Sequence, residues 1–441
     1  MRPCNTQEEN FSLGPEAKIH KRYNAPPSPT LQICQKMKEI EDRGIKIYRL
    51  GFGGSPFPPE QSLVRKYGES LELTHYPDIQ GEFATRAAIA NFYKAYYDLD
   101  FCSQNIFLFP GSKEAIYQIL AVLTGDLLLP QGSWVSYAPQ GSMLSKKIKW
   151  LPTHASNDYK LQAQELDLEL RQSSGAQQNI LILNSPNNPV GSVYSWQELS
   201  ELAAVCKKYK ILVIFDGIYG NRADFDEIPF STMVHTYPEG TIFTGGLSKI
   251  FSAGGWRMGF AAIPRGPGMS SLKRALVYKM SETISGLNAP LQKAAELAYT
   301  PCAQIDVYLN TVQSLFCLAT RYMWKRFCDM GLDCPKPKGA FYVFPSFKRF
   351  SKALKAVDCI SSLQLAEQLL EIGFCALPGE NFGLQGSDFC LRIACVDFDG
   401  ALVYEQAKCG KALDESFVKN YMPKLLEACD ILQNFLKRLS L

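Results

Sequence analysis

The chain has 441 residues, of which 46% are hydrophobic and 20% are charged, a globular composition that excludes disorder as its main state. Lys and Arg together number 46 against 43 Asp and Glu, and no long basic run occurs, which argues against nucleic acid or an anionic membrane as a partner. The fourteen cysteines include no CxxC pair and there are only four histidines, so neither a zinc site nor a disulfide scaffold is expected.

The N-terminal stretch MRPCNTQEENFSLG lacks the apolar core of a signal peptide, and the longest apolar runs have the length of strands rather than of membrane spans. Scattered single cysteines favour a reducing compartment. We therefore expect a soluble cytoplasmic protein whose partners are small molecules.

The predicted elements begin after a segment rich in Pro and Gly, residues 1–57, which we interpret as an N-terminal arm and part of a smaller domain. A helix is predicted to begin after FLFPGSKEA, with apolar residues at helical spacing on its inner face. NILILNS (179–185) and KILVIFDG (210–217) are near-continuous aliphatic runs, typical of parallel strands that are buried on both faces. Between them, Ser195 is a capping residue for a helix with apolar residues at helical spacing.

GTIFTGG and GFAAIP predict two further strands, and the C-terminal third carries short strands, GAFYVF and FCLRIACV, among long amphipathic helices. This order predicts an α/β fold in which a large domain, residues 58–300, has a mainly parallel mixed sheet between helices. Residues 301–441 and the N-terminal segment are expected to form a smaller α+β domain.

TGGLSKIFSAGGWRMGF (244–260) places Lys249 between two glycine pairs, with Arg257 eight residues later. A lysine becomes a nucleophile when desolvation or a neighbouring cation lowers its pKa, and glycines let the backbone approach a flat ligand. On this stretch alone a solvated loop lysine is the favoured interpretation. A nucleotide phosphate loop fits poorly, because GxxxxGK[ST] requires the lysine after the second glycine.

Two other motifs lie at the C-terminal ends of predicted aliphatic strands. FDGIY contains Asp216 and, three residues later, Tyr219, while NSPNNPVG contains Asn188. Ligands of open α/β sheets gather at the carboxyl ends of the strands, so both motifs are expected at one crevice. Taken singly, the first could be a helix cap and the second a turn.

From PPSPT to CLRIACVDF, these motifs come in an order that resembles the fold-type I pyridoxal-phosphate enzymes, specifically the class I/II aminotransferases. The resemblance implies that Lys249 forms the internal aldimine with pyridoxal 5′-phosphate and that Arg257 grips its phosphate. It implies that Asp216 pairs with the pyridine nitrogen, and that Asn188 and Tyr219 reach the phenolic oxygen. Lys249, Asp216 and Tyr219 would be the catalytic residues.

The remaining phosphate contacts implied by the resemblance come from PGSKEA, with Ser112 and Lys113 at a helix start, and from Ser248. In YPDIQGEFATR the family's tyrosine crosses to the neighbouring subunit, so Tyr76 implies a homodimer with shared sites. Two positions depart from the family pattern, because Gly217 replaces the glutamate of DEIY and Gly246 replaces a serine.

The substrate side of the site rests on three further matches. SWVSYAP resembles the segment that supplies the ring-stacking aromatic, here Trp134, for which a plain core tryptophan is the alternative. LRIACVDF carries Arg392, which by the resemblance would donate two hydrogen bonds to the α-carboxylate of the substrate. LGFGGSPF carries Gly53, which corresponds to the family's turn beside that carboxylate. With Asn188 and Trp134, these residues would bind substrate, whereas KGAFYVF and LPGENFG are interpreted as structural landmarks of the smaller domain.

The leading hypothesis is a transferase of amino groups from an L-amino acid to a 2-oxo acid in two ping-pong half-reactions. A lyase or oxidase with the same cofactor and core site is the alternative, since the pocket selects the fate of the carbanion. A non-catalytic ligand-binding module is a third hypothesis, and the intact Lys249 argues against it. No metal site is expected, and the motifs leave the substrate side chain open.

Overall fold

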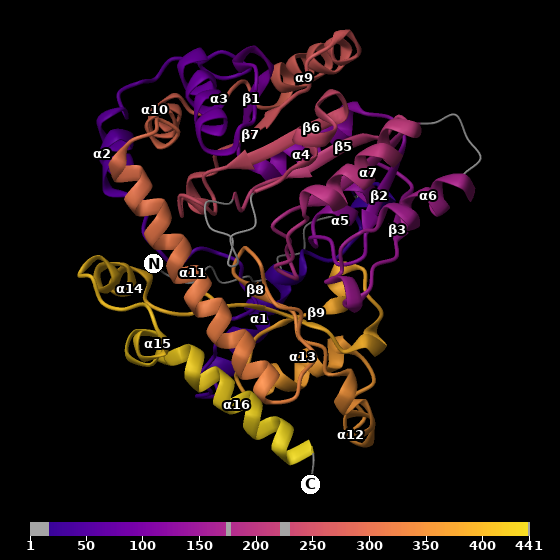
Figure 1. The fold of residues 1–441 in the computed structure, drawn as a ribbon, viewed down its shortest axis with the longest axis vertical. Helices are drawn as coiled ribbons and strands as arrows, with labels where there is room; N and C mark the ends of the chain where they lie inside the picture. The colour runs from indigo at the N-terminus through magenta and orange to yellow at the C-terminus, as the bar shows by residue number, and fades with distance from the viewer. Residues whose placement is uncertain (1–16, 173–177, 221–229, 440–441) are drawn as a thin grey trace, which may run out of the picture.

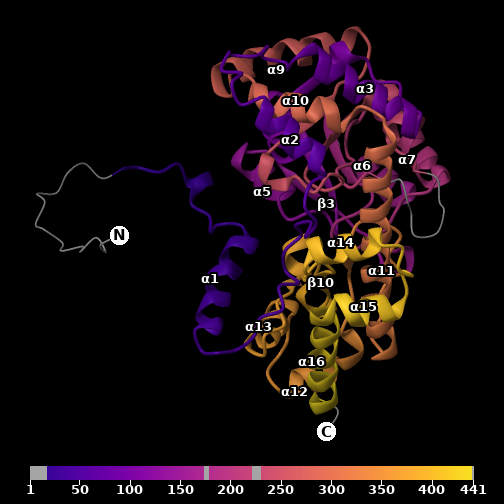
Figure 2. The ribbon, with the colours of Figure 1, turned by 90° about the vertical axis from the view of Figure 1, so that its left-hand side faces the viewer.

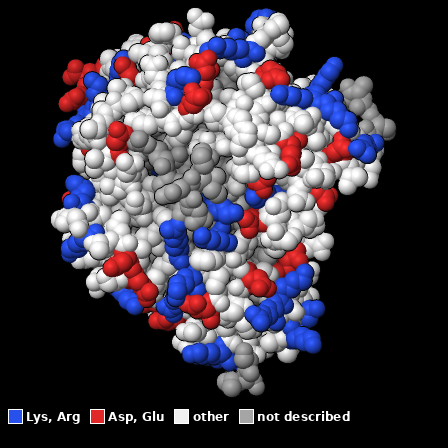
Figure 3. Space-filling model, viewed as in Figure 1, with Lys and Arg blue, Asp and Glu red and all other residues white. Residues whose placement is uncertain are grey.

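The computed structural model describes residues 17–172, 178–220 and 230–439 (Figure 1). The first sixteen residues of the expected N-terminal arm lie outside these ranges. Among the described helices, none combines the length and the apolar run that a membrane crossing requires. Acidic and basic side chains both occur across the face drawn in Figure 3.

A seven-stranded mixed sheet forms the centre of the larger part, in the order β1-β7-β6-β5-β4-β2-β3. Neighbouring strands from β6 through β5, β4 and β2 to β3 are parallel, whereas β7 runs antiparallel to both β6 and β1. The predicted mainly parallel sheet is thereby confirmed. Its strands are β1 (Ile106–Phe109), β2 (Asp126–Pro130), β3 (Ile148–Leu151), β4 (Asn179–Asn184), β5 (Leu212–Asp216), β6 (Thr241–Gly246) and β7 (Gly259–Ala262).

Helices cover both faces of this sheet (Figure 1). Alternate strand residues enter two different hydrophobic cores: Ile180 and Ile214 pack in the core that includes α4 and α9, and Leu181 and Phe215 pack in the core that includes α3 and α7. Burial on both faces is the reason that the strand sequences are continuously apolar. The helices around the sheet are α2 (Gln61–Glu69), α3 (Phe83–Tyr97), α4 (Ser112–Val122), α5 (Tyr137–Met143), α6 (Ala163–Gln172), α7 (Trp196–Lys208), α8 (Met233–Thr236), α9 (Ser270–Thr283) and α10 (Ala289–Ala298).

The predicted helix between β4 and β5 is α7. Ser195 is its N-cap in a capping box with Glu198, and the apolar stripe that the spacing predicted is buried. Strand, helix and parallel strand follow in sequence, which brings the carboxyl ends of β4, β5 and β6 to one edge of the sheet.

A smaller antiparallel sheet has the order β8-β10-β9, and Figure 1 shows its strands β8 and β9 below the large sheet. Figure 2 shows helix α1 beside α13 at the same end of the molecule. Helix α1 near the N-terminus packs Met37 and Ile40 against Leu370 of α13, so segments from both ends of the chain meet here. Residues 48 and 374 also form an isolated parallel bridge. The elements of this part are α1 (Pro29–Glu41), α11 (Ala303–Asp329), β8 (Tyr342–Val343), α12 (Ser351–Ala356), α13 (Ser362–Glu371), β9 (Leu377–Pro378), β10 (Leu391–Ala394), α14 (Gly400–Lys408), α15 (Glu415–Tyr421) and α16 (Pro423–Leu439).

Candidate active site

A cavity of about 500 Å³ lies where the carboxyl ends of the parallel strands face the smaller sheet. All of the site residues predicted from the sequence line this cavity, with the exception of Tyr76. The full lining comprises Gly53, Ser112, Lys113, Trp134, Tyr137, Asn184, Asn188, Asp216, Ile218, Tyr219, Ser248, Lys249, Gly254, Arg257, Tyr342 and Arg392.

Lys249 follows the end of β6 and extends its amine into the cavity. The residue as a whole is half-buried, but its amine is enclosed: burial, followed by the positive charges of Arg392 and Arg257, lowers the pKa of Lys249 to about 8. The Nζ atom donates a hydrogen bond to the carbonyl oxygen of Gly53 and lies 5.8 Å from the centre of the Phe341 ring. A lysine with this pKa has a substantial neutral, nucleophilic fraction near neutral pH.

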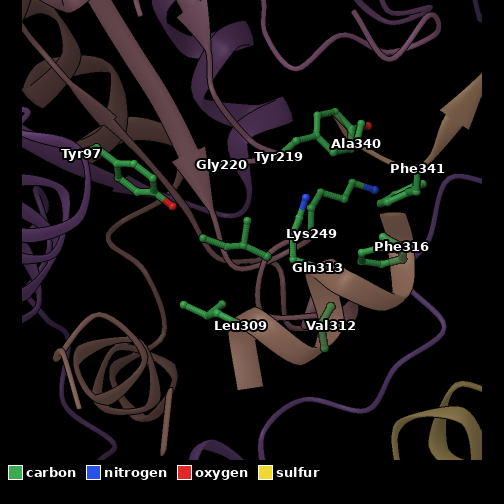
Figure 4. A pocket seen from close by; sticks show the side chains of 11 residues that line it. Tyr97, Tyr219, Gly220, Lys249, Leu309, Val312, Gln313, Phe316, Ala340 and Phe341 are labelled. Carbon is green, nitrogen blue, oxygen red and sulfur yellow. The ribbon is translucent and has the colours of Figure 1, made fainter. Parts of the chain in front are cut away.

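Behind Lys249 lies a second cavity of about 20 Å³, room for about one water molecule (Figure 4). Apolar side chains of α11, among them Leu309, Val312 and Phe316, form one of its walls. This packing explains the enclosure of the lysine.

Asp216 is the last residue of β5 and only 2% exposed. Its carboxylate accepts hydrogen bonds from the hydroxyl of Tyr137 at 2.6 Å and from the backbone amide of Ile218 and the hydroxyl of Thr244, both at 3.3 Å. Burial raises the pKa of Asp216 to about 6, and these donors, Tyr137 foremost, act against that rise. Tyr137 was not among the predicted site residues, although it lies three residues after Trp134 in the quoted segment SWVSYAP.

Positive charge gathers around the N-terminus of α4. Gly111 precedes this helix at φ 93°, and a Cβ on it would come within 2.3 Å of an Nη atom of Arg257, so the guanidinium packs directly on the glycine backbone. Arg257 donates to the carbonyl oxygens of residues 254 and 110 at 2.8 and 3.3 Å. The amine of Lys113 lies 5.0 Å from the Trp134 ring centre, and its pKa is lowered by burial and then by Arg257.

Within the described ranges, neither Arg257 nor Lys113 forms an ion pair with a carboxylate. Ser112 begins α4 and Ser248 adjoins Lys249 on the same wall. Two unpaired cations, two hydroxyls and a helix N-terminus suit a dianionic phosphate.

Asn188 and Tyr219 stand together on another wall of the cavity. The side-chain amide of Asn188 donates to the Tyr219 hydroxyl at 3.3 Å, and its backbone amide donates to the side chain of Asn184 at 2.7 Å. Asn184 in turn donates to the backbone carbonyl of Asp216 at 2.8 Å, which ties the loop after β4 to the end of β5.

Arg392 enters from β10 of the smaller sheet and is 3% exposed. One Nη atom donates to the side-chain oxygen of Asn188 at 3.3 Å and the other to the carbonyl of Gly51, while Nε has no hydrogen-bond partner among the described residues. A buried guanidinium with an unused donor is suited to a carboxylate ligand that accepts two hydrogen bonds.

KGAFYVF was interpreted as a structural landmark of the smaller domain, and its Tyr342 also lines the cavity. The hydroxyl of Tyr342 lies 2.9 Å from that of Tyr219, and its ring lies beneath the guanidinium of Arg392, with 5.0 Å between guanidinium carbon and ring centre. Sequence reasoning missed it because the motif shows only a strand, whereas the contact depends on how the two sheets meet.

Trp134 packs edge to face on Tyr137, with 5.3 Å between the ring centres, and presents its remaining surface to the cavity. Tyr76 is 89% exposed and does not line the cavity of its own chain.

The two glycines that depart from the family pattern, Gly217 and Gly246, are closely packed by neighbouring atoms. A Cβ on Gly217 would lie 2.4 Å from the ring of Phe243, and one on Gly246 would lie 2.6 Å from the carbonyl oxygen of Met258. Neighbouring atoms therefore occupy the space that a side chain at either position would need.

The family model described as aminotransferase class I and II matches residues 51–400. A probable aspartate/prephenate aminotransferase of Rickettsia conorii (strain ATCC VR-613 / Malish 7) is 31% identical over 373 residues, which cover 82% of this chain and 90% of the relative. The aspartate aminotransferase of Bacillus subtilis (strain 168) is 27% identical over 377 residues, covering 83% and 92% of the two chains.

Solved structures share the fold. The aspartate aminotransferase of Thermus thermophilus with maleate aligns with a TM-score of 0.79 at 20% identity, covering 95% of this chain and all of that one. The aromatic aminotransferase of Pyrococcus horikoshii OT3 aligns with a TM-score of 0.75 at 25% identity, covering 91% and 99%. The fold expected from the sequence is confirmed.

Proposed function

Because the chain belongs to the class I and II aminotransferase family, we propose that its cavity binds pyridoxal 5′-phosphate and that Lys249 holds this cofactor covalently. One observation carries the proposal: an enclosed lysine, a buried carboxylate and a cationic helix N-terminus face the same cavity. These groups match the aldehyde, the ring nitrogen and the phosphate of the cofactor.

Each part of the cofactor has a group in the cavity that suits it. Asp216 would face the pyridine nitrogen, Trp134 the ring, and Asn188 and Tyr219 the phenolic oxygen. The residues for the phosphate are Ser112, Lys113, Ser248 and Arg257, joined by Tyr76 of a second copy.

When bound, pyridoxal 5′-phosphate supplies an aldehyde that condenses with amines and a ring that accepts negative charge from the substrate Cα. Asp216, when ionised, would favour the protonated form of the ring nitrogen. With the cofactor bound, the amine of Lys249 would act as the general base that takes the proton from the substrate Cα. Arg392 would hold the α-carboxylate in the cavity that Gly53 also lines.

The chain is an aminotransferase, so its substrates are amino acids and 2-oxo acids. We propose two ping-pong half-reactions, with aspartate as the first amino donor to test because the relatives are aspartate and aspartate/prephenate aminotransferases. The lyase or oxidase alternative is not favoured by these relatives. It predicts more than one equivalent of product per site when no acceptor oxo acid is present, which transamination does not allow.

We propose a homodimer in which Tyr76 reaches the neighbouring site. Its support is the exposure of Tyr76 together with that of Leu71 and Phe83, large side chains in the same stretch of chain. We also propose a cytoplasmic location, because the described cysteines are free thiols, as is typical of proteins in a reducing compartment. The division into residues 1–57, 58–300 and 301–441 remains our proposal for the domains.

The first experiment is reconstitution of purified protein with pyridoxal 5′-phosphate, followed by absorbance and by oxo acid formed from aspartate and 2-oxoglutarate. The wild type is expected to gain the absorbance of lysine-bound cofactor and to resist its removal by dialysis. Lys249→Ala is expected to lose both properties and the activity. An unchanged absorbance and activity in Lys249→Ala would refute the proposed site.

A further inference from the structure

We propose that Tyr342 is a positioning residue that links the carboxylate-binding Arg392 to Tyr219, the hydroxyl that contacts the phenolic oxygen of the cofactor. The inference rests on the proposed function of the cavity. It assigns a role to a residue of the smaller sheet in a reaction whose other groups, apart from Arg392 and Gly53, come from the larger part of the chain.

The position of Tyr342 follows from strand register. In the antiparallel pair of β8 and β10, Tyr342 lies opposite Ala394, and Arg392 is two residues before Ala394 on the same face. The guanidinium therefore stacks on the tyrosine ring at 5.0 Å, in a setting where the ring is 1% exposed. A displacement of Arg392 would therefore also displace the Tyr342 ring.

The direction of the hydrogen bonds is fixed by the arginine. Arg392 can only donate, so the side-chain oxygen of Asn188, 3.3 Å from its Nη atom, must accept. The amide nitrogen of Asn188 then faces both hydroxyls, at 3.3 Å from Tyr219 and 3.5 Å from Tyr342. Each hydroxyl oxygen thus has a donor in the same amide.

One proton remains to be assigned between the two hydroxyls, which are 2.9 Å apart. If Tyr219 donates its proton to the cofactor, its oxygen is free to accept from Tyr342. A hydroxyl that accepts a hydrogen bond becomes a stronger donor, because the bonds in such a chain polarise one another. Tyr342 thereby strengthens the bond from Tyr219 to the phenolic oxygen and favours the ionised form of that oxygen.

Gly53 completes the arrangement. A Cβ at this position would lie 2.2 Å from the hydroxyl oxygen of Tyr342, so only a glycine admits the hydroxyl where it stands. The carbonyl of the same glycine accepts the hydrogen bond from Lys249. The tyrosine hydroxyl therefore adjoins the segment that receives the catalytic amine.

The test is Tyr342→Phe, which keeps the ring under Arg392 and removes only the hydroxyl. We expect the pH midpoint of the absorbance change of bound cofactor to move upward by about half a unit, because a weaker donor at the phenolic oxygen lets the cofactor keep its proton to higher pH. We also expect KM for the amino acid to rise by roughly threefold, with a smaller fall in kcat.

Tyr194→Phe is the matched control. Its hydroxyl is also buried and accepts a hydrogen bond from the amide of Leu161 at 2.8 Å, but it does not line the cavity. The control is expected to lower the melting temperature without moving the pH midpoint. An unmoved midpoint in Tyr342→Phe, with wild-type protein that binds cofactor and transaminates, overturns the inference and leaves the proposed function standing. Failure of the wild type to bind cofactor overturns both.

A second variant covers the case in which Tyr342→Phe folds poorly. Gly53→Ala displaces the hydroxyl without changing the tyrosine, so it should raise the midpoint in the same direction. Combined with Tyr342→Phe, it should add little further shift, because both changes remove one contact. If the shifts of the pH midpoint in the two single variants add in full in the double variant, the proposed link from Tyr342 to Tyr219 is contradicted.

Discussion

The hydroxyl of Tyr137 donates a 2.6 Å hydrogen bond to the carboxylate of Asp216 at the wall of the cavity. Burial raises the pKa of Asp216 to about 6 and this bond opposes the rise, so its removal should raise the pKa further. In Tyr137→Phe a larger fraction of Asp216 is protonated near pH 7 and cannot hold the proton of the ring nitrogen. We expect cofactor affinity at pH 7 to fall by roughly three- to tenfold, as measured by equilibrium titration.

The sign of the pH dependence makes this prediction specific. The carboxyl ionises again as pH rises above its raised pKa, so the affinities of wild type and Tyr137→Phe should converge toward pH 8.5. A loss of affinity that is equal at all pH values would indicate altered packing against Trp134 instead.

Lys249 yields a second prediction from its pKa of about 8, which is lowered mainly by burial and next by the charge of Arg392. The neutral amine is the form that attacks an aldehyde, so the rate of covalent cofactor capture should rise with pH and level off above about 9. Arg392→Gln removes a positive charge that disfavours the protonated amine, and this should move the midpoint of the profile upward. Rapid-mixing absorbance measurements check both statements, and a wild-type rate that still climbs at pH 10 would contradict them.

The fold could be predicted well where local sequence and burial agree. The aliphatic runs that became β4 and β5 have to be buried on both faces, and Ser195 marks the start of the helix between them, so this unit follows from the residues alone. The antiparallel direction of β7 and its place between β1 and β6 depend on long-range pairing, which no local pattern encodes.

The residues of the candidate site also fall into those that the sequence could predict and those that it could not. Lys249, Asp216 and Asn188 could be selected because each sits in a motif of fixed spacing at a strand end, and all three line one cavity. Tyr137 and Tyr342 could not, because a buried tyrosine in an apolar segment is most often a core residue. Their hydroxyls acquire a role only where helix α5 or strand β8 meets the ends of β4 and β5.

The pair of Gly217 and Phe243 leads to a prediction about stability. Gly217→Ala would place a Cβ at 2.4 Å from the Phe243 ring, and overpacking of this kind costs about 1 to 3 kcal/mol of unfolding free energy. Phe243→Leu should also destabilise alone, yet the double variant should be more stable than the sum of the two losses predicts, because the smaller side chain makes room. Urea unfolding of the four proteins measures this coupling, and strict additivity would be the contrary result.

Arg392→Lys tests the carboxylate site separately from the cofactor site. Lysine keeps the charge but loses the planar fork of donors, so KM for every amino acid substrate should rise by roughly ten- to a hundredfold. Cofactor affinity should stay within about twofold, because the proposed phosphate contacts come from α4 and from the segment after β6, whereas Arg392 is on β10. A large loss of cofactor affinity without a change in KM would contradict this prediction, because it would show that Arg392 binds the cofactor and not the substrate carboxylate.

Tyr76 allows the shared site to be tested by mixing subunits. If each site takes Lys249 from one chain and Tyr76 from the other, a dimer of Lys249→Ala with Tyr76→Ala contains one site with both native residues and one with neither. Activity should therefore increase when the two variants are mixed under conditions that exchange subunits, measured at a cofactor concentration too low to saturate Tyr76→Ala. Because Tyr76 is 89% exposed in the single chain, its variant should fold normally. Mixing Lys249→Ala with Asp216→Ala is the control, since both residues belong to the same chain's site and no dimer of these variants regains a complete one. Equal activities before and after the first mixing would show that the sites are not shared through Tyr76.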